Sequence, residues 1–230
     1  MVNATHELSA QHSRSERRRR APAAIRVLAA GAIPYTEAVE AQERLWDARR
    51  RGEIGDTLLL LQHPPVITLG QNGGLEDLRV SIESLQRMGV ELHEANRGGR
   101  ATFHGPGQLV AYPIVKLPDR DVHAYVWKLE ETVLRLLSDW GIAAERVEPY
   151  PGVWIGVNKI ASVGVAVRDD VTTHGLALNV NTDLAGFDLI TPCGLPDRGV
   201  TSMQAVLGRA LPMAEVAEGF VRSFKAVFTG

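Results

Sequence analysis

An uninterrupted apolar run at residues 57–62 (TLLLLQ) is the feature that most constrains what this chain can fold into. Its length suits one strand, and because its leucines follow one another without polar alternation, both faces of that strand are expected to be buried. The next residues, His63-Pro64-Pro65, remove two amide donors, so they must break the strand before residues 66–69 (VITL) resume it. The sequence therefore predicts two successive strands separated by a forced break.

Helical periodicity marks four other segments. Apolar residues recur at helical spacing over residues 35–52, 122–140 and 213–227. A shorter helix is expected between Ser81, which can cap its N-terminus, and Gly89, which can end it. These amphipathic segments each offer one apolar face to a core.

The remaining apolar segments predict strands, at residues 25–31, 109–117, 152–157, 159–167 and 172–181. Residues 96–108 (NRGGRATFHGPGQ) are rich in glycine, and such a loop lets the backbone approach a ligand or another strand closely. Strands mixed with helices, some joined by hairpin-length connections, are typical of an α+β fold in which helices flank a mixed β-sheet. With 45% apolar residues, we expect residues 23–230 to form a single domain.

The first residues differ in charge from the rest of the chain. Residues 1–20 carry five arginines against two glutamates, a net charge of +3, which leaves −5 for the remainder of a chain whose total is −2. Their polar composition favours a disordered basic leader over residues 1–22. Arg26 and Pro34 interrupt the only nearby apolar stretch, which argues against a secretory signal, and the glutamates argue against a mitochondrial presequence.

Charge and composition also exclude some classes of function. An acidic body is a poor candidate for nucleic-acid binding, which depends on clustered positive charge. No stretch reaches the 18 or more apolar residues of a membrane span. Cys193 is the only cysteine, so the chain has no internal disulfide, which favours a reducing compartment and a cytoplasmic location.

Motifs for metals and phosphates are missing. His93-Glu94 opens an HExxH pattern, but Arg97 stands where the second histidine is required. Neither GxxxxGK[ST] nor GxGxxG occurs, and a GxSxG serine elbow is also absent. We therefore expect neither a metal nor a cofactor.

What remains is a thiol and its partners. Cys193 lies between Pro192 and Gly194, which suits a thiol presented at the end of an apolar segment, although an unpaired cysteine is usually a small buried hydrophobe. A nucleophilic thiol needs a base or a nearby cation to raise its thiolate fraction. Lys159 lies between two apolar strands, either as that partner or as an ordinary exposed lysine at a hairpin tip. His104 and His174 stand beside glycines, where each can orient a substrate carbonyl or serve a structural role.

Several of these segments together resemble the octanoyltransferase family of lipoate biosynthesis. The likeness runs from about residue 25 to the C-terminus in the same order and spacing, and it rests on residues 97–110 (RGGRATFHGPGQLV), 152–154 (GVW), 159–164 (KIASVG), 173–179 (THGLALN) and 192–194 (PCG). The resemblance implies a fold like the catalytic domain of biotin and lipoate protein ligases. It also implies transfer of an octanoyl group from octanoyl-acyl carrier protein to a specific lysine of lipoyl domains and of the glycine cleavage H protein.

The resemblance further implies roles for individual residues. Cys193 is expected to be the nucleophile that holds the acyl group as a thioester, and Lys159 the group that lowers the pKa of its thiol. The substrate-binding residues implied in the same way are Arg97, Gly98, Gly99, Arg100, Ala101, Thr102, Phe103, His104, Ser162, Val163, Gly164, Gly175, Leu176 and Ala177. We expect the protein to be a monomer. We also expect it to need no ATP, because a thioester donor already carries the activation energy.

Two other functions stay open at this point. An ATP-dependent lipoate or biotin ligase on the same fold would have no use for Cys193. A non-catalytic module that binds acyl carrier protein would keep the pocket and lose turnover. Only the transferase should transfer an acyl group from the thioester donor when ATP is absent, so this reaction distinguishes it from the ligase and from the binding module.

Overall fold

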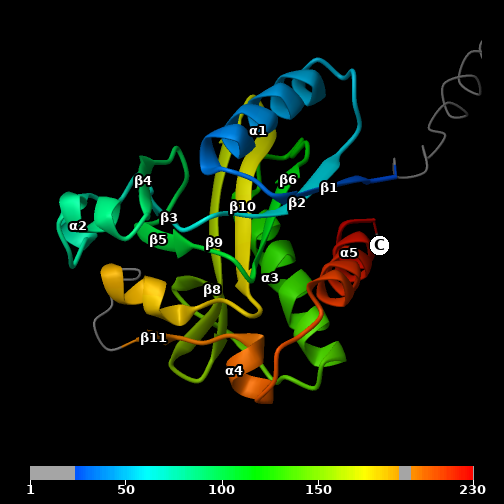
Figure 1. Cartoon of the computed structure of the whole chain (residues 1–230). Coiled ribbons are helices and arrows are strands. Elements are labelled where there is room, and N and C mark those ends of the chain that lie inside the picture. Colours follow the sequence, from blue (N-terminus) through cyan, green and yellow to red (C-terminus); the bar gives the residue numbers. More distant parts are fainter. Residues whose placement is uncertain (1–23, 192–197, 230) are drawn as a thin grey trace, which may run out of the picture.

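The computed structural model describes residues 24–191 and 198–229, so the predicted leader and Cys193 lie outside the described residues. Figure 1 shows strands gathered at the centre with helices around them. The strands are β1 (Arg26–Ala32), β2 (Thr57–Gln62), β3 (Val66–Leu69), β4 (Glu91–Glu94), β5 (Ala101–His104), β6 (Gln108–Ile114), β7 (Glu145–Val147), β8 (Tyr150–Ile155), β9 (Asn158–Arg168), β10 (Val171–Asn179) and β11 (Gly199–Val200). The helices are α1 (Tyr35–Arg50), α2 (Ile82–Arg87), α3 (Val122–Asp139), α4 (Met203–Leu207) and α5 (Met213–Thr229), with 3₁₀ turns η1 (Leu75–Asp77) and η2 (Leu184–Leu189).

The described strands form two sheets. The large sheet has the order β1-β2-β6-β10-β9-β8-β7, with β11 added beside β9, and the small sheet has the order β4-β3-β5. Both sheets are mixed, since β1 and β2 are parallel in one and β3 and β4 in the other, while β2–β6 and β3–β5 are antiparallel. The predicted mixed sheet flanked by helices is confirmed.

The apolar run and its proline break both appear as predicted. Residues 57–61 of β2 are buried, because β1 and β6 pair with its two edges and helices cover the faces of the sheet. After Pro64 and Pro65 the chain does not rejoin the large sheet, and β3 becomes the central strand of the small one. Two missing amide donors therefore mark the point where the chain changes sheets.

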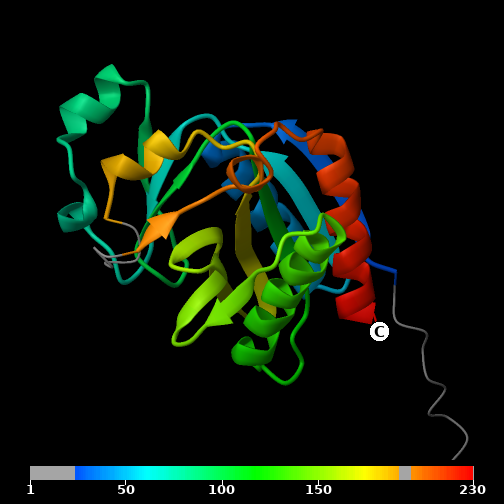
Figure 2. The same cartoon turned by 90° about the horizontal axis from the view of Figure 1, so that it is seen from below.

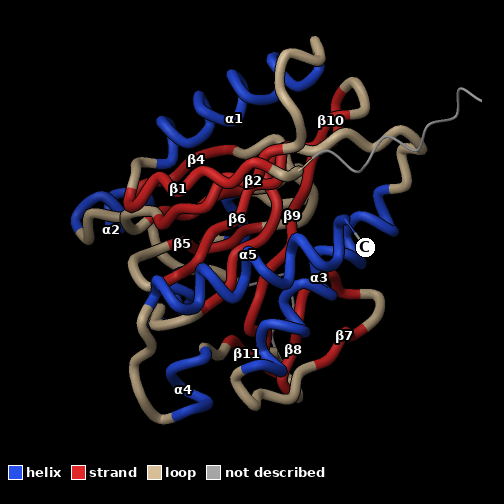
Figure 3. Tube along the Cα trace, turned by 90° about the vertical axis from the view of Figure 1, so that its right-hand side faces the viewer, coloured by secondary structure: helices blue, strands red, loops and turns tan. Residues whose placement is uncertain are grey.

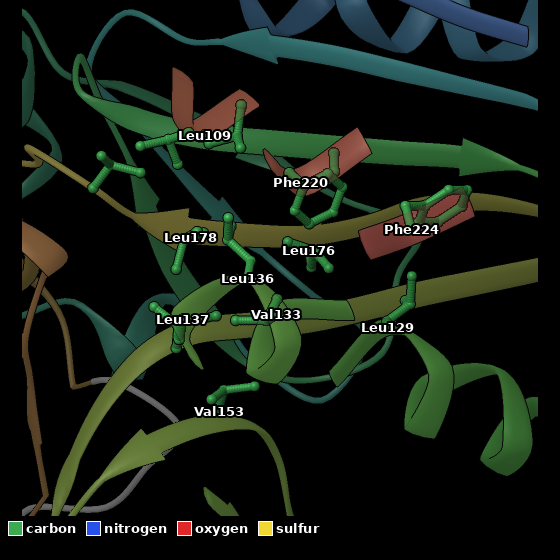
Figure 4. Packing of buried hydrophobic residues seen from close by; sticks show 14 of the residues in the cluster. Leu109, Leu129, Val133, Leu136, Leu137, Val153, Leu176, Leu178, Phe220 and Phe224 are labelled. Atoms are coloured by element: carbon green, nitrogen blue, oxygen red, sulfur yellow. The ribbon is translucent and has the colours of Figure 1, made fainter. Parts of the chain in front are cut away.

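Helices cover the two faces of the large sheet. On one face α1 packs against β6 and β10, with Ala38 contacting the cluster of Leu59, Leu61 and Val110. On the other face α3 and α5 pack against each other and against the sheet, and Figure 4 shows their side chains meeting those of β10. Figure 3 shows the strands of the large sheet between α1 and this pair of helices. No helix among the described residues is long and apolar enough to cross a membrane.

Helix ends match the sequence expectations closely. Ser81 accepts a hydrogen bond from the Ser84 amide at 3.3 Å and caps α2. Gly89 and Gly141 follow α2 and α3 with φ of +69° and +70°, the left-handed conformation that ends helices.

Figure 2 shows α2 and the small sheet on the side of the molecule away from α5.

Part of the glycine-rich segment is a strand, contrary to the expectation of a loop. Ala101–His104 forms β5, which pairs antiparallel with β3 from Ala101 opposite Leu69 to His104 opposite Val66. The glycines on either side obscured this four-residue strand, which depends on a partner more than thirty residues earlier in the chain. Strands β7 and β11, also too short for a periodic pattern, were not predicted.

Candidate functional site

A pocket lies where β9 and β10 of the large sheet approach β5 of the small sheet. About 800 Å³ of space lies between its walls, part of it open to solvent. Its walls come from β5, β9, β10, β11 and the turn before β5, with single residues from α1, β6, β8 and η2. Residues far apart in the sequence meet here because strands of both sheets line the same pocket.

The predicted residues on β9 and β10 are cross-strand partners in this pocket. Ser162 pairs with Ala177, Val163 with Leu176, and Gly164 with Gly175. All six line the pocket. A side chain on Gly164 would meet the Gly98 carbonyl oxygen and the Arg97 side chain at 3.0 Å, so the glycine lets the loop lie directly on the strand.

Lys159 is buried at one end of the pocket. It is 6% exposed, and its Nζ donates a hydrogen bond to the Pro151 carbonyl oxygen at 3.0 Å. The same nitrogen lies 4.6 Å from the centre of the Trp154 ring, close enough for a cation–π interaction. Of the two interpretations of Lys159, the exposed lysine at a hairpin tip is wrong.

Gly152 and Glu130 shape the backbone that holds Lys159. A side chain on Gly152 would meet the Ala161 carbonyl oxygen at 2.6 Å and Lys159 Cε at 3.2 Å, and the φ of +128° at this residue also favours glycine. The Gly152 amide donates to Glu130 Oε1 at 2.8 Å, and Arg146 pairs with Glu130 Oε2 at 3.1 Å. The buried carboxylate therefore anchors the residue next to the carbonyl group that binds Lys159.

Arg97 clamps the turn that closes the pocket. One terminal nitrogen donates to the carbonyl oxygen and hydroxyl of Thr68 at 2.8 and 2.7 Å. The other donates to the carbonyl oxygens of Gly98 and Arg100 at 3.0 and 3.1 Å. The 8% exposed side chain lines the pocket, and these four bonds join the small sheet to the glycine-rich turn.

Two of the predicted substrate-binding residues do not line this pocket. Side chains alternate along β5, so Thr102 and His104 line the pocket while Phe103 packs against Phe187 in the core of the small sheet, with ring centres 5.6 Å apart. Gly98 donates its amide to the Val165 carbonyl oxygen and lines a second cavity. Arg97, Gly99, Arg100 and Ala101 line the pocket as expected, and Arg100 also pairs with buried Asp77 at 2.7 Å.

At the other end of the pocket Tyr35, His104, Tyr112 and His174 form a neutral wall, and His63 lies behind it against Tyr112 and His104. Burial lowers the pKa of His104 to about 3 and that of His174 to about 4, and it also lowers the pKa of His63. Burial raises the pKa of the Tyr35 and Tyr112 hydroxyls. Since uncharged forms are favoured throughout, this wall carries no formal charge near neutral pH.

Hydrogen bonds determine where the protons lie in this wall. His63 Nδ1 lies 2.9 Å from the Ile33 carbonyl oxygen, which can only accept, so this nitrogen carries the proton. Its neutral ring then accepts from the Tyr112 hydroxyl at Nε2, also at 2.9 Å. The Tyr35 hydroxyl is different, because it is buried and has no hydrogen-bond partner among the described residues.

His104 is held in one tautomer by Gln108. The amide nitrogen of Gln108 donates to the Phe103 carbonyl oxygen and to Asn179 Oδ1, so its oxygen is the atom that faces His104 Nδ1 at 2.7 Å. Nδ1 therefore carries the proton and Nε2 is an acceptor. His104 is 6% exposed and lines the pocket, where it can receive a hydrogen bond and carries no charge.

Cys193 lies outside the described residues, but the residues on both sides of its segment are described. Before it, the Thr191 amide donates to the Asp77 carbonyl oxygen at 2.8 Å. After it, the Arg198 guanidinium lies 4.8 Å from the Trp154 ring centre, and Val200 pairs with Lys159. The chain therefore returns from the cysteine segment directly beside Lys159.

Sequence reasoning missed seven residues of the pocket wall. It named His174 as a histidine that can orient a substrate carbonyl or serve a structural role. It gave no site role to Tyr35, Tyr112, Trp154, Phe187, Arg198, Gly199 or Val200, all of which line the pocket. Aromatic residues in predicted helices and strands are usually core, so only Arg198, five residues after the lone cysteine, carried a usable signal.

Comparisons with known proteins agree with this architecture. The family described as the lipoyl protein ligase A/B catalytic domain matches residues 34–225. An octanoyltransferase of Chloroflexus aggregans is 52% identical over 203 residues, which cover 86% of this chain and 92% of that protein. One of Caldicellulosiruptor bescii is 49% identical over 208 residues, covering 89% and 91%. The match to an octanoyltransferase of Myxococcus xanthus, also 49% identical over 89% of this chain, spans 59% of that protein.

Solved structures share the fold at low identity. A putative lipoate protein ligase of T. acidophilum with bound lipoic acid has a TM-score of 0.69 at 19% identity, covering 88% of this chain and 85% of that one. A lipoate-protein ligase A bound with ATP has a TM-score of 0.70 at 18% identity, covering 88% and 84%. A biotin protein ligase of Aquifex aeolicus has a TM-score of 0.56 at 15% identity, covering 88% and 69%. At these identities the likeness is one of fold.

Proposed function

The chain belongs to the octanoyltransferases of the lipoyl protein ligase A/B catalytic-domain family, and we propose that it works through an acyl-thioester on Cys193 formed beside Lys159. It transfers an octanoyl group from acyl carrier protein to a lysine of lipoyl domains. The observation that carries the proposed mechanism is a buried lysine at the end of a pocket, paired with Val200, which follows the lone cysteine by seven residues. The glycine cleavage H protein is proposed as a further acceptor.

The reaction divides into two acyl transfers. In the first, the Cys193 thiolate attacks the donor thioester carbonyl, the bond from carbon to the carrier sulfur breaks, and the carrier thiol leaves with a proton. In the second, the acceptor lysine amine attacks the enzyme thioester, an amide forms, and the Cys193 thiolate is released. One activated thiol serves both steps in a ping-pong scheme.

Lys159 handles the charge and the protons of both steps. A neighbouring ammonium lowers the pKa of a thiol and so raises the thiolate fraction available for attack. In the first step the Lys159 ammonium gives its proton to the leaving carrier thiolate and becomes a neutral amine, and in the second step this amine receives the proton that the incoming lysine must lose. The Pro151 carbonyl oxygen and the Trp154 ring, both within reach of Nζ, hold the lysine in the position that both steps need.

The pocket binds the acyl chain along β9 and β10. Val163, Leu176 and Ala177 supply apolar surface, and burying the chain of an octanoyl group contributes roughly 5 kcal/mol at about 0.8 kcal/mol per methylene. The glycines at 164 and 175 let neighbouring backbone pack directly against this wall, because a side chain at 164 would meet the Gly98 carbonyl oxygen and one at 175 the Ala111 carbonyl oxygen. The thioester donor supplies the activation energy, so the proposed reaction uses no ATP and no cofactor.

The decisive experiment is acylation of the purified protein by octanoyl-acyl carrier protein without ATP. Intact mass should show the addition of one octanoyl group, and peptide mapping should place it on Cys193. The Cys193→Ser variant should form no thioester with the same donor. A second incubation with an apo lipoyl domain should move the octanoyl group to one lysine of that domain.

Other outcomes point to other functions. Octanoylation of the lipoyl domain that appears only with free octanoate and ATP would show a ligase. Binding of the carrier protein without any transfer would show a non-catalytic module. We also propose that the enzyme acts as a monomer in the cytoplasm, which light scattering of the purified protein and fractionation of cells test directly.

A further inference from the structure

Two cavities meet at the end of the acyl pocket that lies away from Lys159. The second, here called the outer cavity, lies between α1, β9 and the turn before β5, and it is lined by residues that include Val39, Ala95 and Val165. Tyr35 and His174 are the residues common to the walls of both cavities. These two side chains therefore form the partition between them.

Strand register places this partition further along β9 and β10 than Lys159. Lys159 lies at the start of β9, and Val165, six residues further on, pairs with His174. The Lys159 side chain reaches along β9 to the carbonyl oxygen of Pro151, whose neighbour Gly152 pairs with Ser162, so at roughly 3.3 Å per residue the ammonium lies about 10 Å from Val165 along the strand. A chain whose carbonyl group lies beside Lys159 therefore extends along the strands toward Tyr35 and His174.

Both side chains of the partition are buried and closely packed. Tyr35 is 4% exposed, contacts the His63 ring edge-on with ring centres 5.6 Å apart, and packs in a cluster with Val66 and Ala95. His174 is 8% exposed, and its ring meets that of Tyr112 edge-on at 6.0 Å. Its amide donates to Gln42 on α1 at 2.6 Å, which ties this end of β10 to the helix that carries Tyr35.

We propose that Tyr35 and His174 set the upper limit on the length of the acyl chain. They end the acyl pocket, and their removal would join it to the outer cavity, where Val39, Ala95 and Val165 offer apolar surface to a longer tail. This inference rests on the proposed acyl-enzyme mechanism and adds to it a limit on the length of the acyl chain. The substrates that the partition excludes are saturated acyl chains longer than eight carbons.

Two variants open the partition in different ways. Tyr35→Ala removes the ring from the α1 side. His174→Gly removes the imidazole from the β10 side, and the φ of +56° at this residue favours glycine, so the backbone accepts the change without strain. Tyr35→Phe is the matched control, because it removes only a hydroxyl that has no partner among the described residues and leaves the ring in place.

The experiment measures the ratio of kcat/KM for dodecanoyl- and octanoyl-acyl carrier protein, with transfer to an apo lipoyl domain as the readout. We expect the natural protein to favour the octanoyl donor by more than tenfold. Each opening variant should raise the dodecanoyl to octanoyl ratio by roughly tenfold or more, the scale at which pocket size discriminates between chains. Tyr35→Phe should keep the ratio of the natural protein.

The other possible results distinguish a failure of the proposed length limit from a failure of the proposed mechanism. If folded Tyr35→Ala and His174→Gly both keep the original ratio, or if the natural protein takes both donors equally, the two side chains do not limit chain length. If Tyr35→Ala fails to fold, His174→Gly decides alone. If the natural protein forms no octanoyl thioester at all, the proposed mechanism fails, which is a different result from octanoyl transfer with an unchanged length preference.

Discussion

The ammonium nitrogen of Lys159 donates a hydrogen bond to the carbonyl oxygen of Pro151 at 3.0 Å. This bond is made within the β8–β9 hairpin, so the position of the lysine depends on the local conformation of residues 150–159 and on what anchors them. The anchor is Glu130, which binds the next amide along, that of Gly152. The environment of the proposed catalytic lysine is therefore set by a helix that contributes no residue to the pocket wall.

Replacing Lys159 by methionine should raise the pKa of the Cys193 thiol. Without the neighbouring ammonium, the thiol should titrate closer to the ordinary value of about 8.5. Because Cys193 is the only cysteine, the rate of alkylation by iodoacetamide measured against pH reports this pKa directly. Octanoyl transfer at pH 7 should fall by roughly 10²- to 10⁴-fold, the usual contribution of a positioned acid or base.

The control for this change is Lys116→Met, which removes an exposed lysine. Its alkylation profile should match that of the natural protein. If Lys159→Met leaves the profile where it was, Lys159 does not activate the thiol.

Gly152→Ala should slow the formation of the octanoyl-enzyme by displacing the Lys159 side chain. The new methyl group would meet the Ala161 carbonyl oxygen at 2.6 Å and Lys159 Cε at 3.2 Å, so the lysine must move. We expect the rate of octanoyl-enzyme formation to fall at least about tenfold, since small misplacements of a catalytic group are costly. Rapid-quench measurement of the acylated fraction by mass spectrometry gives this rate.

Gly156→Ala is the matched variant in the same hairpin. Gly156 also has a positive φ, of +57°, but a methyl group there meets nothing within 4 Å. It should lower stability by about 1 kcal/mol through backbone strain and leave the acylation rate nearly unchanged. Equal effects of the two substitutions on the acylation rate would mean that crowding of Lys159 is unimportant.

Arg97→Lys should loosen the turn that closes the pocket. A lysine cannot reproduce the planar guanidinium that binds Thr68 and two backbone carbonyl groups, and the buried acceptors would lose partners. We expect the free energy of unfolding to fall by roughly 2 kcal/mol or more. Urea denaturation followed by circular dichroism measures the change, and kcat/KM for octanoyl transfer should fall with it.

Arg135→Lys provides the comparison for a surface site. Arg135 pairs with Glu131 one turn away on α3, and its side chain is half exposed. Exposed pairs contribute at most about 1 kcal/mol, so this variant should stay close to the natural protein. If both variants lose a similar free energy of unfolding, the hydrogen bonds of the Arg97 guanidinium do not hold the turn in place.

The neutral histidines of the pocket wall should make the protein lose stability in weak acid. The folded-state pKa values of His104 and His174 are lowered to about 3 and about 4, whereas the unfolded chain takes up a proton near pH 6.5. The unfolded state therefore binds more protons as the pH falls from about 6.5 toward 4, and stability falls over that window. The loss should be on the order of 2 kcal/mol per histidine between pH 7 and pH 5.

Urea unfolding at pH 7 and pH 5 tests this expectation. His104→Gln should reduce the difference in the free energy of unfolding between the two pH values, because it removes one group that titrates only on unfolding. His123→Gln, on the exposed surface of α3, should leave the difference as it is. A natural protein that is equally stable at both pH values would contradict the buried neutral state.

The sequence by itself determined the elements with a strong local signal. The apolar run of β2, the amphipathic stripe of α3, and the caps at Ser81 and Gly89 all follow from side-chain periodicity and turn chemistry, which act over a few residues. The order of motifs also determined the family. The predicted residues on β9 and β10 lie together because one hairpin holds them in register.

Only the tertiary structure decided which side of each element faces the pocket. Phe103 turns into the small core while Thr102 and His104 face the site, a consequence of the pairing of β5 with β3. Tyr35 and Tyr112 look like ordinary core residues until α1 and β6 bring them to the end of the pocket. Periodicity specifies that a face is buried, but what it is buried against depends on contacts between distant segments, and no local pattern encodes those contacts.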